Sequence, residues 1–268
     1  MARIKIGDID IVSLPDVNGG YAQSFVFPET PASAWEPYRG LYPHTFKGDD
    51  LQLAVDTFAV VGAGRTILVD TGIGRVGPFA ETAGLLDALR SEGLDAARID
   101  TVIHTHLHGD HIGWNMVGGK QTFANARHVA QQLDYDHFSA ADDAMFKAQI
   151  QPIFDAGRLE LVSGETSYAP HITLIPTPGH TPGHQSIVVT SRGESAIITG
   201  DIAHHPAQCE ETSWRDFFDM DAAAACASRA QLMQRLETDG TLAALCHFPA
   251  PGFGRVERRN GRRIFVPV

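Results

Sequence analysis

The segment His-Thr-His-Leu-His-Gly-Asp-His at residues 104–111 constrains this chain more than any other part of its sequence. Its metal-competent side chains are His106, His108, Asp110 and His111. They directly follow an apolar strand predicted at 101–103, so a loop after that strand can turn them inward, and Gly109 permits the tight backbone that this requires. A solvated histidine-rich loop is the alternative, but the flanking residues are apolar. The segment therefore predicts a metal site that the fold must enclose.

Three further candidate ligands lie far along the chain, each just beyond an apolar strand. They are His180, Asp201 and His247. A catalytic zinc ion takes three protein ligands and keeps one position open, so the four candidates within residues 106–111 already exceed one site. Side chains at the ends of separate strands can converge on one rim of a sheet. We therefore expect seven ligands at a shared site.

Strand and helix patterns are interleaved twice along the chain, without a Gly-x-Gly-x-x-Gly fingerprint. Strands are predicted at 4–14, 53–61, 66–69, 101–103, 172–175, 186–190, 196–198, 242–245 and 263–266, and helices at 78–91, 127–136, 143–156 and 220–237. We predict an α/β fold with a single domain over 1–268, an αββα sandwich of two mixed β-sheets with helices on the outer faces. Residues 15–50, rich in Gly, Pro and aromatic residues, are predicted as a long loop that forms either an active-site lid or an irregular surface wrap.

Composition narrows the expected partners and the compartment. The chain has 32 Asp and Glu against 21 Lys and Arg, and its net charge of −11 disfavours nucleic acid and anionic membranes. The arginine-rich stretch 255–263 is interpreted as a solvated hairpin, because Asn260 and Gly261 mark a tight turn within it. The longest uncharged stretch, 166–191, is interrupted by prolines and is not a membrane helix. Three scattered cysteines and an N-terminal segment without a secretory apolar run predict a cytoplasmic protein.

The order of these motifs resembles the metallo-β-lactamase superfamily, from about residue 55 to 250. The landmarks are the turn Asp70-Thr71-Gly72, the H-x-H-x-D-H signature of residues 106–111, and the outlying His180, Asp201 and His247. The resemblance implies a dinuclear site in which His106, His108 and His180 bind one metal, and Asp110, His111 and His247 bind the other. Asp201 would bridge the two metals, and Asp70 would accept a hydrogen bond from a ligand imidazole. The resemblance is to the branch that contains lactonases and parathion hydrolases.

The donor types indicate which metals fit. Five imidazoles and two carboxylates without a thiolate suit zinc, and also iron, cobalt or manganese, with zinc as the default expectation. A redox-active di-iron relative would typically carry Glu at the place of His108. We therefore expect two divalent metal ions that serve hydrolysis.

The resemblance also implies a reaction, in which a hydroxide held between the metals attacks a carbonyl carbon while Asp110 orients it. His204 stands where acyl-homoserine lactonases commonly carry a tyrosine, and its imidazole can donate a hydrogen bond or a proton to the leaving group. A lactone or other carboxylic ester fits this reaction best. The alternatives are a phosphotriester hydrolase, a thioesterase like glyoxalase II, and a metal-binding protein without catalysis.

Several residues near the ligands keep two interpretations. Trp114, Met116 and Phe248 either form the wall of a substrate pocket or belong to the core. His104 is taken as a structural histidine, and His184 either supports a ligand or is a hydrogen-bonded core residue. A small-molecule substrate is the expected partner, with no nucleic acid and no membrane, and a homodimer is left open.

Overall fold

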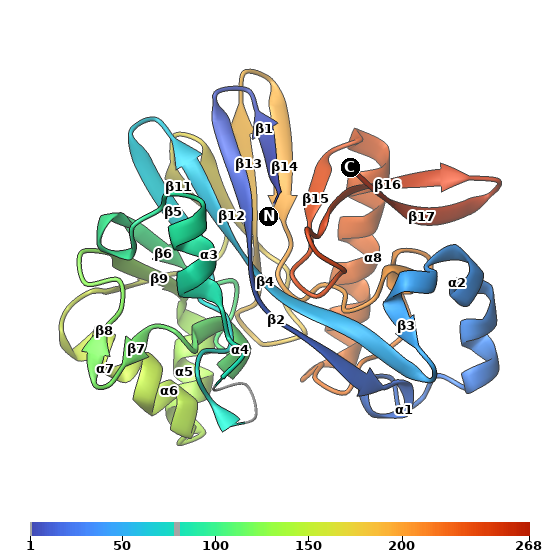
Figure 1. Ribbon diagram of the computed structural model, residues 1–268, viewed down its shortest axis with the longest axis horizontal. Helices are drawn as coiled ribbons and strands as arrows, with labels where there is room; N and C mark the ends of the chain where they lie inside the picture. Colours follow the sequence, from blue (N-terminus) through green and yellow to red (C-terminus); the bar gives the residue numbers. More distant parts are fainter. Residues whose placement is uncertain (1, 78–80) are drawn as a thin grey trace.

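The computed structural model describes residues 2–77 and 81–268 and contains two mixed β-sheets packed face to face (Figure 1). The first sheet has the order β1 (Arg3–Ile6), β2 (Ile9–Ala22), β4 (Asp50–Gly62), β5 (Arg65–Val69), β6 (Thr101–Ile103), β9 (Arg127–Gln131) and β10 (Leu159–Val162), and β3 (Phe46–Lys47) pairs with β4. The second has the order β11 (Thr166–Ala169), β12 (Ile172–Pro176), β13 (Gln185–Ser191), β14 (Glu194–Ile198), β15 (Leu242–Ala244), β16 (Phe253–Arg259) and β17 (Arg262–Pro267). The short strands β7 (Met116–Val117) and β8 (Lys120–Gln121) form a separate hairpin. The predicted αββα sandwich is confirmed.

Apolar side chains from both sheets form the core between them. Phe58 and Ile103 of the first sheet belong to the same buried cluster as Leu174 and Ile198 of the second. Their strands are rich in β-branched and apolar residues on the facing sides, as expected for sheets buried against each other. The burial of these apolar side chains is the main favourable contribution to the free energy of packing the two sheets together.

Helices cover the outer faces of both sheets (Figure 1). Their bounds are α1 (Gln23–Val26), α2 (Glu36–Leu41), α3 (Leu85–Ser91), α4 (Gly109–Ile112), α5 (Gln132–Ala140), α6 (Ala144–Gln149), α7 (Gln151–Asp155) and α8 (Ala222–Asp239). Leu85 and Leu89 of α3 pack on the first sheet, and Leu232 and Met233 of α8 pack on the second. Within the described residues, no helix is both long and apolar enough to cross a bilayer.

The prediction of a long loop over 15–50 was wrong. Strand β2 continues to Ala22 and pairs with β4 along almost its whole length, with a register shift between Pro15 and Val17. The helices α1 and α2 follow, and Trp35 and Tyr38 from this segment are buried in the core. The prolines and glycines of this segment indicated a loop, but pairing with β4 stabilises it as the second half of strand β2.

Three predicted helices also differ from the structure. Residues 127–131 form β9 between two parallel neighbours, and helix α5 begins only at Gln132. The helix expected over 143–156 is divided into α6 and α7 around Ile150, ahead of Pro152, because proline cannot continue a helix. Helix α3 begins at Leu85, and residues 78–80 of the predicted helix lie outside the described residues. Strands β3, β7, β8, β10, β11 and β16 had not been predicted.

Candidate metal centre

The candidate ligands come from the ends of strands in both sheets. Strand β6 ends at Ile103 and leads into the histidine segment, where α4 carries Asp110 and His111. In the second sheet, His180 follows β12, Asp201 follows β14 and His247 follows β15. Because β14 and β15 are parallel neighbours, the residues after them emerge at the same edge. The seven side chains therefore meet where the two sheets face each other.

Three imidazoles form the first donor set. His108 Nδ1 lies 3.1 Å from His106 Nε2 and 2.9 Å from His180 Nε2. Asp201 Oδ2 lies 3.2 Å from His180 Nε2 and 3.7 Å from His106 Nε2. These atoms surround one point, which is the arrangement that a cation with nitrogen and oxygen ligands requires.

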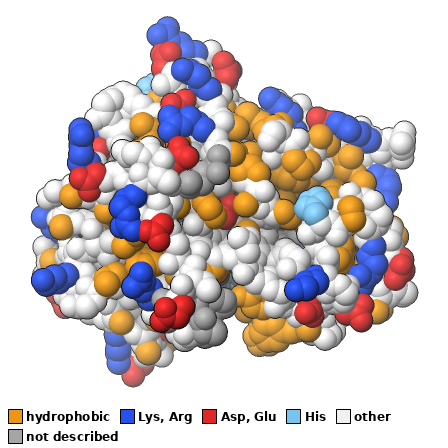
Figure 2. Space-filling model, viewed as in Figure 1, with side chains coloured by type: hydrophobic (Ala, Val, Ile, Leu, Met, Phe, Trp, Pro, Cys, Tyr) orange, Lys and Arg blue, Asp and Glu red, His pale blue; other side chains and the backbone are white. Residues whose placement is uncertain are grey.

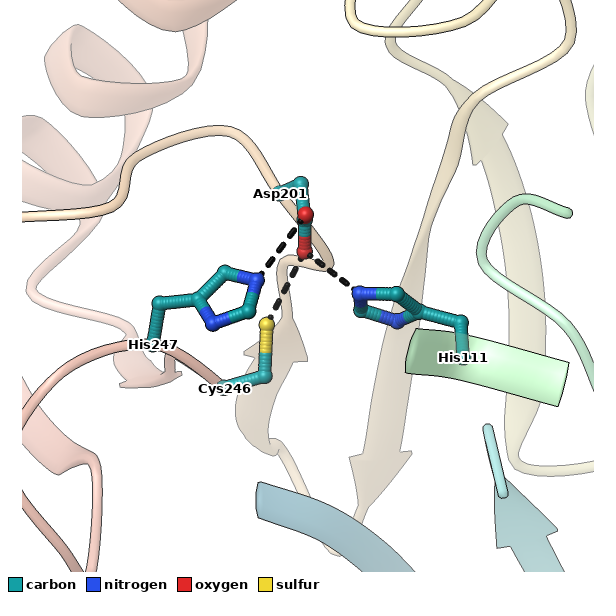
Figure 3. Close-up of side chains that lie close together, drawn as sticks. All are labelled: His111, Asp201, Cys246 and His247. Atoms are coloured by element: carbon teal, nitrogen blue, oxygen red, sulfur yellow. Dashed lines mark hydrogen bonds and ion pairs between the residues drawn. The ribbon is translucent and has the colours of Figure 1, made fainter. Parts of the chain in front are cut away.

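Asp201 also faces the second donor set (Figure 3). His111 Nε2 lies 3.1 Å from Asp201 Oδ1, and His247 Nε2 lies 3.0 Å from Asp201 Oδ2. Asp110 Oδ2 is 3.7 Å from Nε2 of both histidines. Asp201 thus stands between the two sets, as a bridging carboxylate would.

A thiol joins this second set and was not predicted. The Sγ atom of Cys246 lies 3.1 Å from Asp201 Oδ1, and the sulfur belongs to a group with His111, Asp201 and His247 whose ligand atoms lie within 4.8 Å of one another. The position of Cys246 directly before His247 was the only sequence signal for it. Burial, followed by the nearby Asp201 carboxylate, raises the pKa of this thiol well above its usual value.

One feature of the structure directly supports the binding of divalent cations by these donor sets. The ring nitrogen Nε2 of His111 is buried and lies 3.1 Å from Asp201 Oδ1, but among the described residues it makes no hydrogen bond of good geometry. A buried polar atom without a well-formed hydrogen bond is costly, so a cation at this point would remove the penalty. Imidazole nitrogens that face one another at 2.9–3.1 Å, as in the first set, are also typical of ligands around a metal.

The charges of the site suit cation binding as well. Burial, together with the neighbouring His180 ring, lowers the pKa of His108 to about 3, and a neutral imidazole is the form that binds metals. Burial opposes ionisation of Asp201, but the surrounding histidines, His111 first, hold its carboxyl pKa well below the usual range. Burial lowers the pKa of His180, yet Asp201 and Asp219 raise it to about 9. Asp201 is therefore ionised, and its negative charge would be stabilised by a bound cation.

Hydrogen-bond acceptors behind the histidines orient their rings. Asp70 Oδ2 lies 2.9 Å from His111 Nδ1, and the same carboxylate accepts bonds from the backbone and hydroxyl of Thr105. His247 Nδ1 lies 2.7 Å from the carbonyl oxygen of Ala54. His180 Nδ1 lies 3.2 Å from Asp219 Oδ1, a partner that was not predicted. Such partners fix which ring nitrogen is free for a metal.

The remaining histidines of the region take distinct positions. His204 Nε2 lies 3.3 Å from Asp201 Oδ2 and lines the cavity described below. His184 Nε2 accepts the backbone N–H of Asp201 at 2.9 Å, so His184 holds the loop that carries Asp201. His104 is buried, and its Nε2 lies 3.2 Å from Nδ1 of His128, away from the donor sets.

A cavity of about 520 Å³ opens over the two donor sets. Its lining is mostly apolar, and it includes Tyr21, Phe25, Leu53, Ala54, Val55, Ile73, Val76, Met145 and Phe218 together with His108, Asp110, His180, Asp201, His204 and His247. Phe25 is half-exposed, and Figure 2 shows hydrophobic side chains gathered at the lower edge of the molecule, over α1. No Lys or Arg occurs among the described residues that line the cavity.

The predicted pocket residues Trp114, Met116 and Phe248 do not occur among these described lining residues. Trp114 is buried in the core beside the first sheet, where its Nε1 donates to Asp16 Oδ1 at 2.9 Å. Phe248 packs against Phe265 in the core beside the second sheet. Met116 lies in the β7–β8 hairpin, and its backbone N–H donates to Gln149. Segments distant in sequence, such as α1 and the end of β2, form the cavity wall instead.

Comparison with known proteins places this chain in a family. The model of the metallo-β-lactamase superfamily matches residues 51–247. An N-acyl homoserine lactonase from Bacillus sp is 27% identical over 176 residues, which are 59% of this chain and 67% of the relative. The lactonase AttM from Agrobacterium fabrum is 31% identical over 143 residues, which are 50% of this chain and 52% of AttM. This chain thus spans about half to two thirds of the length of these relatives.

Two solved structures share the whole architecture. The hydrolase AbOPH superposes with a TM-score of 0.90 at 23% identity, covering 99% of this chain and 96% of AbOPH. The dizinc quorum-quenching lactonase AidC, in complex with its product, superposes with a TM-score of 0.86 at 21% identity, covering 100% of this chain and 97% of AidC. At 21–23% sequence identity, the similarity to these two structures shows a shared fold only. Together with the family match over most of its length, it shows that this chain belongs to the metallo-β-lactamase superfamily.

Proposed function

We propose that this protein is a dinuclear metal-dependent hydrolase that cleaves a lactone or other carboxylic ester with an apolar substituent. The observation that carries the proposal is the position of Asp201, which stands between two donor sets at the base of an apolar cavity. Zinc is the proposed metal, and the protein is proposed to act in the cytoplasm. The named activities of AttM and AidC support the lactone as substrate class.

Two divalent cations bound at this site would supply a hydroxide near neutral pH and would polarise the substrate carbonyl. His106, His108 and His180 would hold one, His111, His247 and Asp110 the other, and Asp201 both. Asp110 also borders the cavity, so its carboxylate can orient the attacking group and accept its proton.

His204 is the proposed proton donor to the leaving group. Its ring borders the cavity and lies flat against His247, with centroids 4.6 Å apart and an interplanar angle of 12°. Burial alone would lower the pKa of His204, but the carboxylates of Asp216 and Asp201 raise it well above its usual value. A ring held in its protonated form can deliver a proton to an alkoxide.

The apolar wall restricts the substrate. The cavity lining, as far as the structure describes it, has no Lys or Arg that could pair with the carboxylates of a glutathione thioester. A neutral acyl chain can pack against Leu53, Val55 and Phe218, which gains free energy from buried apolar area. A neutral phosphotriester would also fit this wall and is the second candidate.

A substrate panel tests the proposal. Values of kcat/KM are measured with purified, zinc-loaded protein on acyl lactones of increasing chain length, an aryl phosphotriester and a glutathione thioester. We expect the lactones to be cleaved at least tenfold more efficiently than the other two, with efficiency rising with acyl length. A phosphotriester rate above every lactone rate would replace the proposal by the second candidate, and no hydrolysis of any substrate would refute both.

A further inference from the structure

Arg229 is a fully buried arginine of α8 that joins two carboxylates behind the site. Its Nη2 donates to Asp219 Oδ2 at 3.0 Å and lies 3.6 Å from Asp216 Oδ2. The side chains of both aspartates have no exposed surface. Buried charges require compensation, so one guanidinium is shared by two carboxylates.

The guanidinium is fixed by backbone as well. Its Nε donates to the carbonyl oxygen of Ile202 at 2.6 Å, and Nη1 donates to those of Thr212 and Trp214 at 3.0 Å and 2.7 Å. These bonds attach the loop that carries His204 to α8. Because the planar fork of an arginine is held at several points, it sets the positions of both aspartates.

Each of the two carboxylates faces a different histidine. Asp219 Oδ1 is hydrogen-bonded to His180 Nδ1 at 3.2 Å, and Asp216 Oδ2 forms an ion pair with His204 Nδ1 at 3.2 Å. The opposite ring atoms of these histidines converge, since His180 Nε2 and His204 Nε2 lie 3.2 Å and 3.3 Å from the same atom, Asp201 Oδ2. Two histidine–aspartate pairs therefore run side by side from Arg229 to the cavity.

We propose that Arg229 is a positioning residue that assigns these two histidines to different tasks. Through Asp219 it fixes the ring of His180 as a metal ligand, and through Asp216 it fixes the ring of His204 toward the substrate. A carboxylate behind an imidazole sets its orientation and its free nitrogen, so each aspartate controls one histidine only. The His204 half rests on the proposed function, whereas the His180 half concerns metal binding alone.

The variants Asp219→Asn and Asp216→Asn test this assignment of separate tasks to His180 and His204. Asparagine has nearly the shape of aspartate but carries no charge. Zinc affinity is measured by competition with a chromogenic chelator, and kcat is measured on a lactone and on a p-nitrophenyl ester. We expect Asp219→Asn to weaken zinc binding at one site ~10–100-fold. We expect Asp216→Asn to retain both zinc ions and to lower kcat on the lactone ~10–100-fold with little change in KM.

The p-nitrophenyl ester separates positioning from general structural damage. Its leaving group is weakly basic and departs without a proton, so Asp216→Asn should slow this substrate much less than the lactone. Equal losses on both substrates, or loss of zinc from Asp216→Asn, would overturn the assignment of His204. Unchanged zinc affinity in Asp219→Asn would overturn that of His180, even if no substrate were hydrolysed.

Arg229→Lys tests the shared arginine. Lysine keeps the charge but cannot hold both carboxylates in one planar fork, so zinc affinity and lactone turnover should both fall. Arg235→Lys is the matched control, since Arg235 lies on the same helix, is exposed and pairs only with Asp239 at 3.7 Å among its described ion pairs. An Arg229→Lys protein that resembles the control in both measurements would refute the role of Arg229.

Discussion

Three histidines of the centre, His111, His180 and His247, are each oriented by a partner of the second ring nitrogen. His111 and His180 have carboxylates behind them, whereas His247 has a backbone carbonyl oxygen. His184 accepts a backbone N–H with the nitrogen that a ligand would use, which explains why it supports Asp201 without entering a donor set. The role of an imidazole here follows from its hydrogen bonds more than from its distance to the centre.

Substitutions at the centre should separate metal binding from turnover. Asp201→Ala removes the carboxylate between both donor sets, so metal content and hydrolysis should fall together, by about two ions and more than ~100-fold in kcat/KM. His204→Ala should keep both ions and slow turnover of lactones ~10²-fold or more. Elemental analysis beside kinetics checks both. A fully active His204→Ala protein would remove that side chain from the reaction.

Asp56 should make stability depend on pH. Burial raises its carboxyl pKa to about 7, against a usual 3.8, despite the hydrogen bond that Ser13 donates. A raised folded-state pKa means that the folded protein binds the proton more tightly, so this contribution to stability falls as pH rises from about 4 to about 7. Asp56→Asn should therefore gain stability over the native chain across this interval, by roughly 2–4 kcal/mol at its upper end.

Urea unfolding at several pH values measures the effect of Asp56→Asn. The exposed Asp239→Asn serves as control and should follow the native curve. A difference between Asp56→Asn and the native chain that stays constant from pH 4 to pH 8 would contradict the assignment of the titration to Asp56.

At the scale of elements, close contact between the turn after β5 and the end of α4 positions the candidate metal ligands of α4. The turn after β5 and the end of α4 exchange backbone bonds, since Thr71 N–H donates to the His111 carbonyl oxygen at 2.8 Å and Gly113 N–H donates to that of Gly72 at 2.8 Å. Gly113 has an ordinary backbone conformation, with φ −65° and ψ −24°. A Cβ atom at Gly113 would nevertheless overlap the carbonyl group of Ile73. Space, rather than backbone freedom, requires glycine at this position.

Gly113→Ala should therefore push α4 away from the turn. We expect a loss of about 1–3 kcal/mol in unfolding free energy, as for other overpacked sites, and weaker zinc binding through Asp110 and His111. Gly40→Ala is the matched control, because nothing lies within 4 Å of a Cβ there and alanine favours its helix. Thermal unfolding and chelator competition compare the two. A Gly113→Ala protein as stable as Gly40→Ala would contradict the steric argument.

At the scale of the molecule, the centre connects the two sheets. One part of the ligand set follows β6 of the first sheet, and the other part follows β12, β14 and β15 of the second (Figure 1). Apart from Cys246, which borders both, the apolar core between the sheets is formed by other residues. Metal ions at the centre would thus add a cross-link to a sandwich that already has its own hydrophobic core.

Metal removal should lower stability while leaving the fold in place. Ligands that bind only the folded state raise its stability by mass action, so a chelator should lower Tm by several degrees and abolish hydrolysis, with the far-ultraviolet circular dichroism preserved. Added zinc should restore both Tm and activity. In His180→Ala the zinc-dependent rise in Tm should be smaller. Complete unfolding of the metal-free chain at room temperature would show that the core alone is insufficient.

The dense spacing of residues 106–111 and the strand before them determined the presence of a metal site, because chelating chemistry needs particular side chains at short intervals. The alternation of strands and helices likewise determined the layered fold. Only the tertiary structure decided that residues 127–131 are a strand, since β9 is held by parallel neighbours on both sides. It also decided that Cys246, Asp219 and Arg229 belong to the centre and that Trp114 and Phe248 belong to the core. Those positions depend on contacts between distant parts of the chain, which local periodicity does not encode.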